Sequence, residues 1–286
     1  MSMEKSIAGS AGKKTMARGQ AVILAVIIAL TVLAWVYTAY AGSADGMGGM
    51  VMDMAAADPS MDAAMEERLA AAASGPSLPA FEMFVPMWIA MSVGMMLPTA
   101  LPMILCMNKI CERRKTQGRA YAPSWFFTLG YVVLWALFGV VCWAAAYVLF
   151  GLVGSYLQNW RILWLVVGGV FVFAGIYQLS PLKNACLKGC QHPVSFIMRN
   201  WREGKGGALL MGMRHGLTCI GCCAALMIVM FPLGMMNLFW MGIFTVLMFA
   251  EKNAKFGLLL SRVMGWLLLV AGGIIAAIGV VFLAVG

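Results

Sequence analysis

The chain has 286 residues, of which 63% are hydrophobic and 11% are charged, and its mean hydropathy is +0.89. Soluble domains carry roughly 25% charged residues, so this composition excludes an ordinary soluble globular protein and predicts a lipid bilayer as the surrounding medium. The net charge of +9 comes from short basic segments between apolar runs. Because these segments lack interleaved aromatic residues, they indicate membrane topology, and we expect no nucleic-acid partner.

The apolar runs predict an all-α, polytopic transmembrane bundle with about seven spans. The expected spans cover residues 20–40, 81–107, 123–150, 162–179, 207–231, from the turn at 232–234 to 251, and 255–286. The basic segments at 109–119 and 180–206 then fall on one face, which places the N-terminus inside and the C-terminus outside. We expect an integral protein of a bacterial or archaeal inner (cytoplasmic) membrane.

Three regions follow from this pattern. Residues 1–41 form a cytoplasmic N-terminal tail and the first span, which we expect to be retained, although small residues near its end leave cleavage open. Residues 42–80 form an external acidic loop rich in methionine, and residues 81–286 form a six-span membrane domain that holds the predicted metal site. Pro98 and Pro102 predict that the span over 81–107 is kinked or broken near its inner end.

The most informative segment is 214–223, which places an imidazole and three thiols inside a predicted span. On a helix Cys219, Cys222 and Cys223 stand at i, i+3 and i+4 and share one face, and His215 lies one turn earlier. Thiolate and imidazole ligands suit Cu(I) or Zn(II), and an ionisable residue in a span indicates a functional site. The alternative is that the cysteines are small buried hydrophobic residues.

Methionine is unusually frequent, with 26 residues, and forms two further groups. In the second span Met91 and Met95 lie four residues apart on one face, beside Met96, where a methionine stripe is also compatible with core packing. In the external loop methionines need not pack in a hydrophobic core, so a ligand role is favoured, and thioether sulfur favours Cu(I) over Zn(II). The alternative is that the composition of this loop drifted without a function. The predicted thioether ligands of this loop are Met47, Met50, Met52 and Met54.

The inner loop over 180–206 contains a further thiol pair, Cys186 and Cys190, at i and i+4. Lys183 and Lys188 are expected to lower the pKa values of these thiols and to favour the thiolate. The pair could exchange a soft metal with the cysteines of the span, or it could form a structural latch.

Several motifs together resemble a family of predicted metal-binding integral membrane proteins of unknown function. The resemblance covers about residues 83–256 and rests on Met95-Met96-Leu97-Pro98, residues 177–190, residues 214–223 and Glu251-Lys252. The chain departs from the family pattern after the double cysteine, where it has Ala224 and Ala225 and the family has Trp. The resemblance implies metal binding at His215, Cys219, Cys222, Cys223, Cys186 and Cys190.

These features predict a membrane-embedded protein that binds soft metal, Cu(I) first and Zn(II) as the alternative. It would act in copper transport or in delivery to a copper chaperone or metalloenzyme partner. Because Cys219 and Cys222 form a CxxC spacing, a thiol–disulfide redox protein is a rival hypothesis, and a structural accessory subunit of a membrane complex is another. No nucleotide-binding or zinc-protease motif is present, so an enzyme is the less favoured reading.

Overall fold

The computed structural model describes residues 2–44, 81–157, 160–234 and 237–285, and in these ranges the chain is all-helical, without strands. The nine described helices are α1 (Ser2–Ala44), α3 (Phe81–Thr116), α4 (Ser124–Leu157), α5 (Trp160–Leu179), α6 (Pro181–Gln191), α7 (Pro193–Asn200), α8 (Gly204–Leu233), α9 (Leu238–Asn253) and α10 (Gly257–Val285). The segment over 180–206, expected as a loop, therefore contains two short helices, α6 and α7. The methionine-rich segment at 42–80 lies almost wholly outside the described residues.

Six of the described helices, α1, α3, α4, α5, α8 and α10, are long and apolar enough to cross a membrane. The expected span before residue 251 is α9, which has 16 residues. A helix of that length is about 24 Å long, less than the roughly 30 Å hydrocarbon core, so the count of seven spans stays a prediction. Helix α3 continues as one helix through Pro86, Pro98 and Pro102, so of the two expected alternatives, a kink or a break, the break is wrong.

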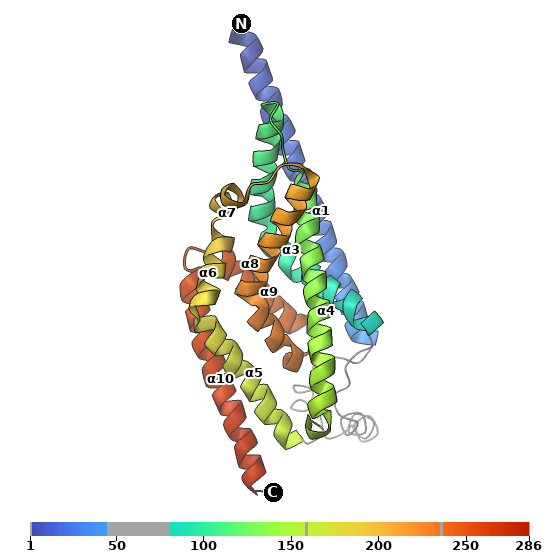
Figure 1. Cartoon of the computed structure of the whole chain (residues 1–286), viewed down its shortest axis with the longest axis vertical. Helices are drawn as coiled ribbons and strands as arrows, with labels where there is room; N and C mark the ends of the chain where they lie inside the picture. The colour runs from blue at the N-terminus through green and yellow to red at the C-terminus, as the bar shows by residue number, and fades with distance from the viewer. Residues whose placement is uncertain (1, 45–80, 158–159, 235–236, 286) are drawn as a thin grey trace.

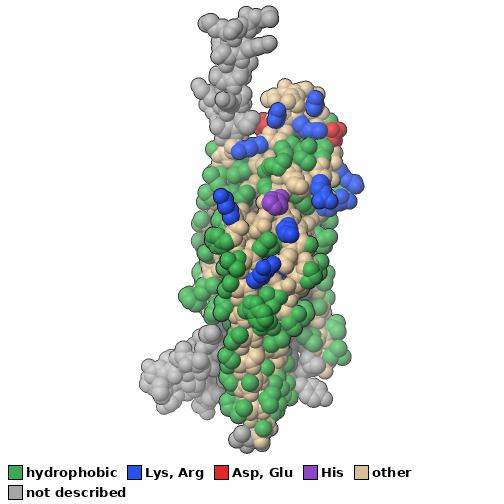
Figure 2. Space-filling model, turned by 90° about the vertical axis from the view of Figure 1, so that its left-hand side faces the viewer, with side chains coloured by type: hydrophobic (Ala, Val, Ile, Leu, Met, Phe, Trp, Pro, Cys, Tyr) green, Lys and Arg blue, Asp and Glu red, His purple; other side chains and the backbone are tan. Residues whose placement is uncertain are grey.

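The helices pack mainly in pairs, with α1 against α3, α4 against α8 and α5 against α10, while the short α6 lies against α8 (Figure 1). The two termini lie at opposite ends of the long axis. On the face shown in Figure 2, Lys and Arg side chains lie over the upper and middle parts of the molecule, and its lower end is hydrophobic. This distribution is the one expected if the upper end faces the cytoplasm.

Glycines let the paired helices approach closely. On α10, Gly265, Gly272 and Gly279 recur every seven residues, and on α5 Gly168 and Gly175 have the same spacing. A Cβ atom added at Gly168 would lie 2.6 Å from the Ala276 backbone nitrogen, so the two backbones touch along this seam. Small residues at helix contacts are typical of membrane helices, where close van der Waals packing takes the place of the hydrophobic effect.

An indole from α1 compensates for a proline in α3. Pro98 has no N–H, so the Gly94 carbonyl oxygen four residues earlier loses its helical hydrogen bond. Trp35 Nε1 donates to this oxygen at 3.2 Å, and the indole also covers the space that a side chain at Gly94 would need. The contact shows how α3 remains helical through a proline, because a neighbouring helix supplies the missing donor.

The variant Trp35→Phe is expected to lower the free energy of unfolding by about 1 kcal/mol, because it keeps an aromatic ring but leaves the buried Gly94 carbonyl without a donor. Thermal unfolding of the detergent-solubilised protein should show a decrease of about 2–4 °C. Trp266→Phe on α10 is the control, since Trp266 is 63% exposed. Equal unfolding temperatures for the two variants would contradict the compensating role of Trp35.

Candidate metal centre

Three thiols on one face of α8 lie together in the interior. The sulfur atoms of Cys219, Cys222 and Cys223 are within 4.8 Å of one another, and each residue is 1% exposed. The Cys222 and Cys223 thiols both donate to the Cys219 carbonyl oxygen, at 3.1 and 2.8 Å. The i, i+3, i+4 spacing thus brings the sulfurs together on one helix, and the backbone orients two of them.

A thioether from α3 joins this thiol cluster. Met96 Sδ lies 3.7 Å from Cys223 Sγ, and Met96 is fully buried. Met91 and Met95 on the same helix are buried in the hydrophobic core, a position that is compatible with packing as well as with a ligand role. The other predicted thioether ligands, Met47, Met50, Met52 and Met54, lie outside the described residues.

Helix α6 adds its two cysteines at the other side of the cluster. Cys190 Sγ lies 3.8 Å from Cys222 Sγ. Cys186 faces α8 at Gly221, where an added Cβ atom would lie 2.6 Å from the Cys186 sulfur. The Gly221 carbonyl in turn accepts a hydrogen bond of 2.6 Å from the Tyr177 hydroxyl of α5. Because residue 221 has no side chain, α6 can lie directly on the cysteine face of α8.

The expectation that neighbouring lysines lower the thiol pKa values in α6 is wrong. Burial raises the pKa of Cys186, and the nearby Cys222 raises it further. Hydrogen bonds with the Cys219 and Cys222 sulfurs raise the pKa of Cys190 well above its ordinary value. The two lysines act elsewhere, because Lys183 is engaged with Glu251 and Lys188 is exposed. The α6 thiols are therefore stabilised in their protonated form.

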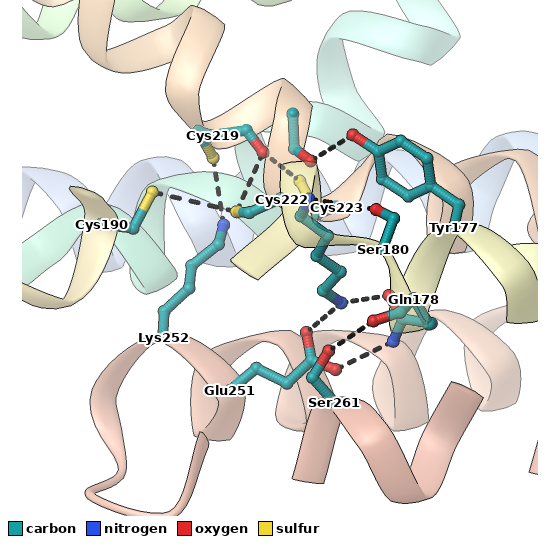
Figure 3. A network of polar contacts seen from close by, with 12 residues as sticks. Tyr177, Gln178, Ser180, Cys190, Cys219, Cys222, Cys223, Glu251, Lys252 and Ser261 are labelled. Carbon is teal, nitrogen blue, oxygen red and sulfur yellow. Dashed lines mark hydrogen bonds and ion pairs between the residues drawn. The ribbon is translucent and has the colours of Figure 1, made fainter. Parts of the chain in front are cut away.

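A buried ion pair holds α6 in this position (Figure 3). Lys183 Nζ lies 2.8 Å from Glu251 Oε2, and the side chains are 0% and 2% exposed. Gln178 Nε2 donates to the other Glu251 oxygen at 3.0 Å, and Gln191 Nε2 donates to the Glu251 carbonyl at 2.8 Å. The network joins α5, α6 and α9, so it fixes the helix that carries Cys190 relative to the core. Glu251 does not pair with Arg214, which is exposed and donates to Asn200.

His215 lies next to the thiol cluster, one turn before Cys219, and is 2% exposed. Its ring stacks between Phe127 and Tyr131, with centroids 5.7 and 5.4 Å away. Its Nδ1 has no hydrogen-bond partner among the described residues. His215 is outside the group of three sulfurs, but it lines a small pocket together with Cys219 and Cys190. A buried nitrogen without a partner is a candidate ligand atom, since such atoms are rare in folded proteins.

Two polar neighbours of the cluster were not predicted from the sequence to lie beside it. Lys252, at 5% exposure, places its Nζ 3.0 Å from Cys219 Sγ, 3.0 Å from Thr99 Oγ1 and 3.6 Å from Met96 Sδ. The Tyr131 hydroxyl lies 3.1 Å from the same Cys219 sulfur. For Lys252 the usable signal was the Glu251-Lys252 pair at the end of the sixth expected span, because charged side chains at the edge of an apolar run need partners when they are buried. For Tyr131 the sequence offers no signal, because one aromatic residue in a span is ordinary.

The donor set fits a soft metal. Thiolate and thioether sulfur are ligands of soft metals such as copper and zinc, and no carboxylate belongs to the thiol cluster among the described residues. The cluster is buried between α3, α6 and α8, so a bound ion would be protected from water and from oxidation. The geometry can therefore hold a soft metal on sulfur ligands supplied by several helices.

Comparison with known proteins gives a family for the chain. No curated protein and no solved structure matches it. A family model described as PpoB2, a copper chaperone, matches residues 85–275, which is more than half of the chain and includes all the cysteines and lysines of the cluster described above. The sulfur-lined centre fits the copper binding that this match indicates, and the chain belongs to the PpoB2 copper chaperone family.

Proposed function

We propose that this protein is embedded in the cytoplasmic membrane, binds Cu(I) at Cys219, Cys222 and Cys223, and delivers it to a partner metalloprotein. The observation that supports this function best is the convergence of the three buried sulfurs, joined by the Met96 thioether. Membership of a copper chaperone family supports delivery over a purely structural role. The six long apolar helices are compatible with the embedding.

The arrangement of sulfur ligands supports a route for the ion. Methionines of the external segment 42–80 would collect Cu(I), and Met91, Met95 and Met96 on α3 would conduct it to the α8 thiols. Cys190, 3.8 Å from Cys222, and then Cys186 would receive it from that site by exchange of one sulfur ligand for another. This route assumes the topology predicted from the basic segments, with the N-terminus and α6 at the cytoplasmic side.

The test of the proposed function is the copper content of the purified protein after anaerobic loading with Cu(I). Wild-type protein should retain about one equivalent per chain, and a variant with Ser at 219, 222 and 223 should retain almost none, because serine hydroxyls are hard, weak ligands for Cu(I). Cys142→Ser is the control, because Cys142 lies on α4 outside the thiol cluster. The protein with this substitution should keep its copper.

Full copper occupancy in the triple variant would contradict this site assignment. Absence of copper from wild type as well would contradict the proposed function, and it would favour a thiol–disulfide protein in which Cys190 and Cys222, with sulfurs 3.8 Å apart, form the reactive pair. Zinc retention in place of copper would show that the site binds the alternative metal.

A further inference from the structure

The ammonium group of Lys252 lies among the sulfur atoms proposed to bind copper. An ammonium has three N–H donors, and here each has an acceptor: the Cys219 sulfur, the Met96 sulfur and the Thr99 hydroxyl. Figure 3 shows the side chain reaching from α9 to the cysteines of α8. The group is therefore a cation held at the metal centre by acceptors from two helices, α3 and α8.

Within the described part of the chain, the partners of Lys252 are two sulfurs and a hydroxyl, and no carboxylate is among them. Glu251, the neighbouring acid, already forms a buried pair with Lys183, and this pair has no net charge. Tyr131 and Thr99, which face the same sulfurs, are neutral groups. When the cysteines are left out of the count, the described groups around the cluster thus carry one net positive charge. A buried charge is stable only when it is paired, and the available partners are the cysteine sulfurs, of which Cys219 lies 3.0 Å away.

We propose that Lys252 is the counter-ion of the bound metal and selects Cu(I) over a divalent ion by the charge of the complex. When two thiols bind Cu(I), each releases a proton to solvent, copper keeps its oxidation state, and the resulting complex has a charge of −1. The ammonium of Lys252 balances that charge. The same two thiolates with Zn(II) give a neutral complex, so the lysine would be left as an unpaired buried cation.

This assignment rests on the proposed function and specifies its ligands further. It requires that two of the three cysteines bind as thiolates and that any third donor is neutral, because a third thiolate would make the Cu(I) complex −2 and leave one charge uncompensated. Met96, whose thioether lies 3.7 Å from Cys223, supplies a neutral sulfur at this position. Lys252 is thus a specificity-determining residue, which acts through charge next to the sulfur ligands.

The variant Lys252→Met tests the proposal, because it preserves the length of the side chain and removes its charge. Affinities for Cu(I) and Zn(II) are measured separately on the full-length, detergent-solubilised protein by competition with a chromophoric chelator of each metal. Cu(I) affinity should fall about 10- to 100-fold, the range usual for loss of an outer-shell partner, and Zn(II) affinity should rise or stay unchanged. Lys252→Arg, which keeps the charge, should retain the preference for Cu(I).

Three results would overturn the proposal. An equal fall for both metals would show that the variant has only disturbed the site, and a rise in Cu(I) affinity would show that the ammonium competes with copper for the sulfurs. An unchanged ratio of the two affinities would also exclude a role for the charge. Wild-type protein that binds Cu(I) in the same experiment separates these outcomes from a failure of the proposed function, in which wild type itself would take up no Cu(I).

Discussion

The variant Glu251→Gln is expected to lower the free energy of unfolding by about 3–5 kcal/mol, the usual cost of removing one partner of a buried ion pair. Lys183 and Glu251 lie 2.8 Å apart with side chains 0% and 2% exposed. Glutamine preserves the shape of the side chain but has one acceptor oxygen in place of two. The loss therefore reports the Lys183 ammonium left buried without a counter-ion, together with one buried donor that has lost its acceptor. Unfolding of the detergent-solubilised protein by a denaturing detergent measures this difference.

The chain provides a matched control for this variant. Arg114 and Glu203 form an ion pair with the same 2.8 Å distance, but their side chains are 27% and 53% exposed. Glu203→Gln should therefore cost at most about 1 kcal/mol, because solvent screens an exposed pair. A double variant, Lys183→Met with Glu251→Leu, should recover most of the stability, since it removes both charges together. Equal small effects of Glu251→Gln and Glu203→Gln would contradict the importance of the buried pair.

The same pair connects stability with the metal centre. Glu251 also accepts from Gln178 on α5, and its carbonyl accepts from Gln191 at the end of α6, next to Cys190. When the pair is lost, α6 keeps the hydrogen bond from Gln191 to the Glu251 carbonyl but loses its ion pair with α9, so Cys190 is held less firmly near Cys222. The proposed transfer of copper to the α6 thiols should then be slower, although the three α8 thiols would remain in place.

The sequence predicted the part of the centre that lies on one helix. The positions of Cys219, Cys222 and Cys223 follow from helical periodicity, because the 3.6-residue repeat places i, i+3 and i+4 on one face whatever the rest of the fold does. The all-helical architecture follows in the same way from apolar runs of about 20 residues. Local geometry was sufficient for both predictions.

The contacts between helices were not predictable from one sequence. Met91, Met95 and Met96 were equivalent candidates in the sequence, and the packing of α3 on α8 decides that Met96 contacts Cys223. Lys183 was expected to activate thiols, yet its nearest carboxylate lies 68 residues further along the chain, at Glu251. Long-range packing decides which partner a charged side chain reaches, and a single sequence gives no information on such pairs.

The contact between α4 and α8 is closest at Gly212, and the variant Gly212→Val is expected to disrupt it. A Cβ atom at this position would lie 2.0 Å from the Phe127 carbonyl oxygen and 2.8 Å from its carbon. Because these are backbone atoms, no rotamer change can relieve the overlap, and the helices must separate. Overpacking of this kind typically lowers the free energy of unfolding by about 1–3 kcal/mol. We expect a loss near the upper end of this range, because no side chain can move to relieve the overlap. Thermal unfolding in detergent measures the loss.

Separation of these two helices should also change the metal centre, since α4 carries Tyr131, whose hydroxyl lies 3.1 Å from the Cys219 sulfur, and α8 carries the cysteines themselves. Gly212→Val should therefore lose copper affinity together with stability. Gly169→Ala on α5 is the control, because an added Cβ atom there meets nothing within 4 Å, and the higher helix propensity of alanine should leave stability unchanged or raise it by up to about 1 kcal/mol. If Gly212→Val bound copper as wild type does, the site would depend on α8 alone, and the contact with α4 would serve stability without positioning any ligand.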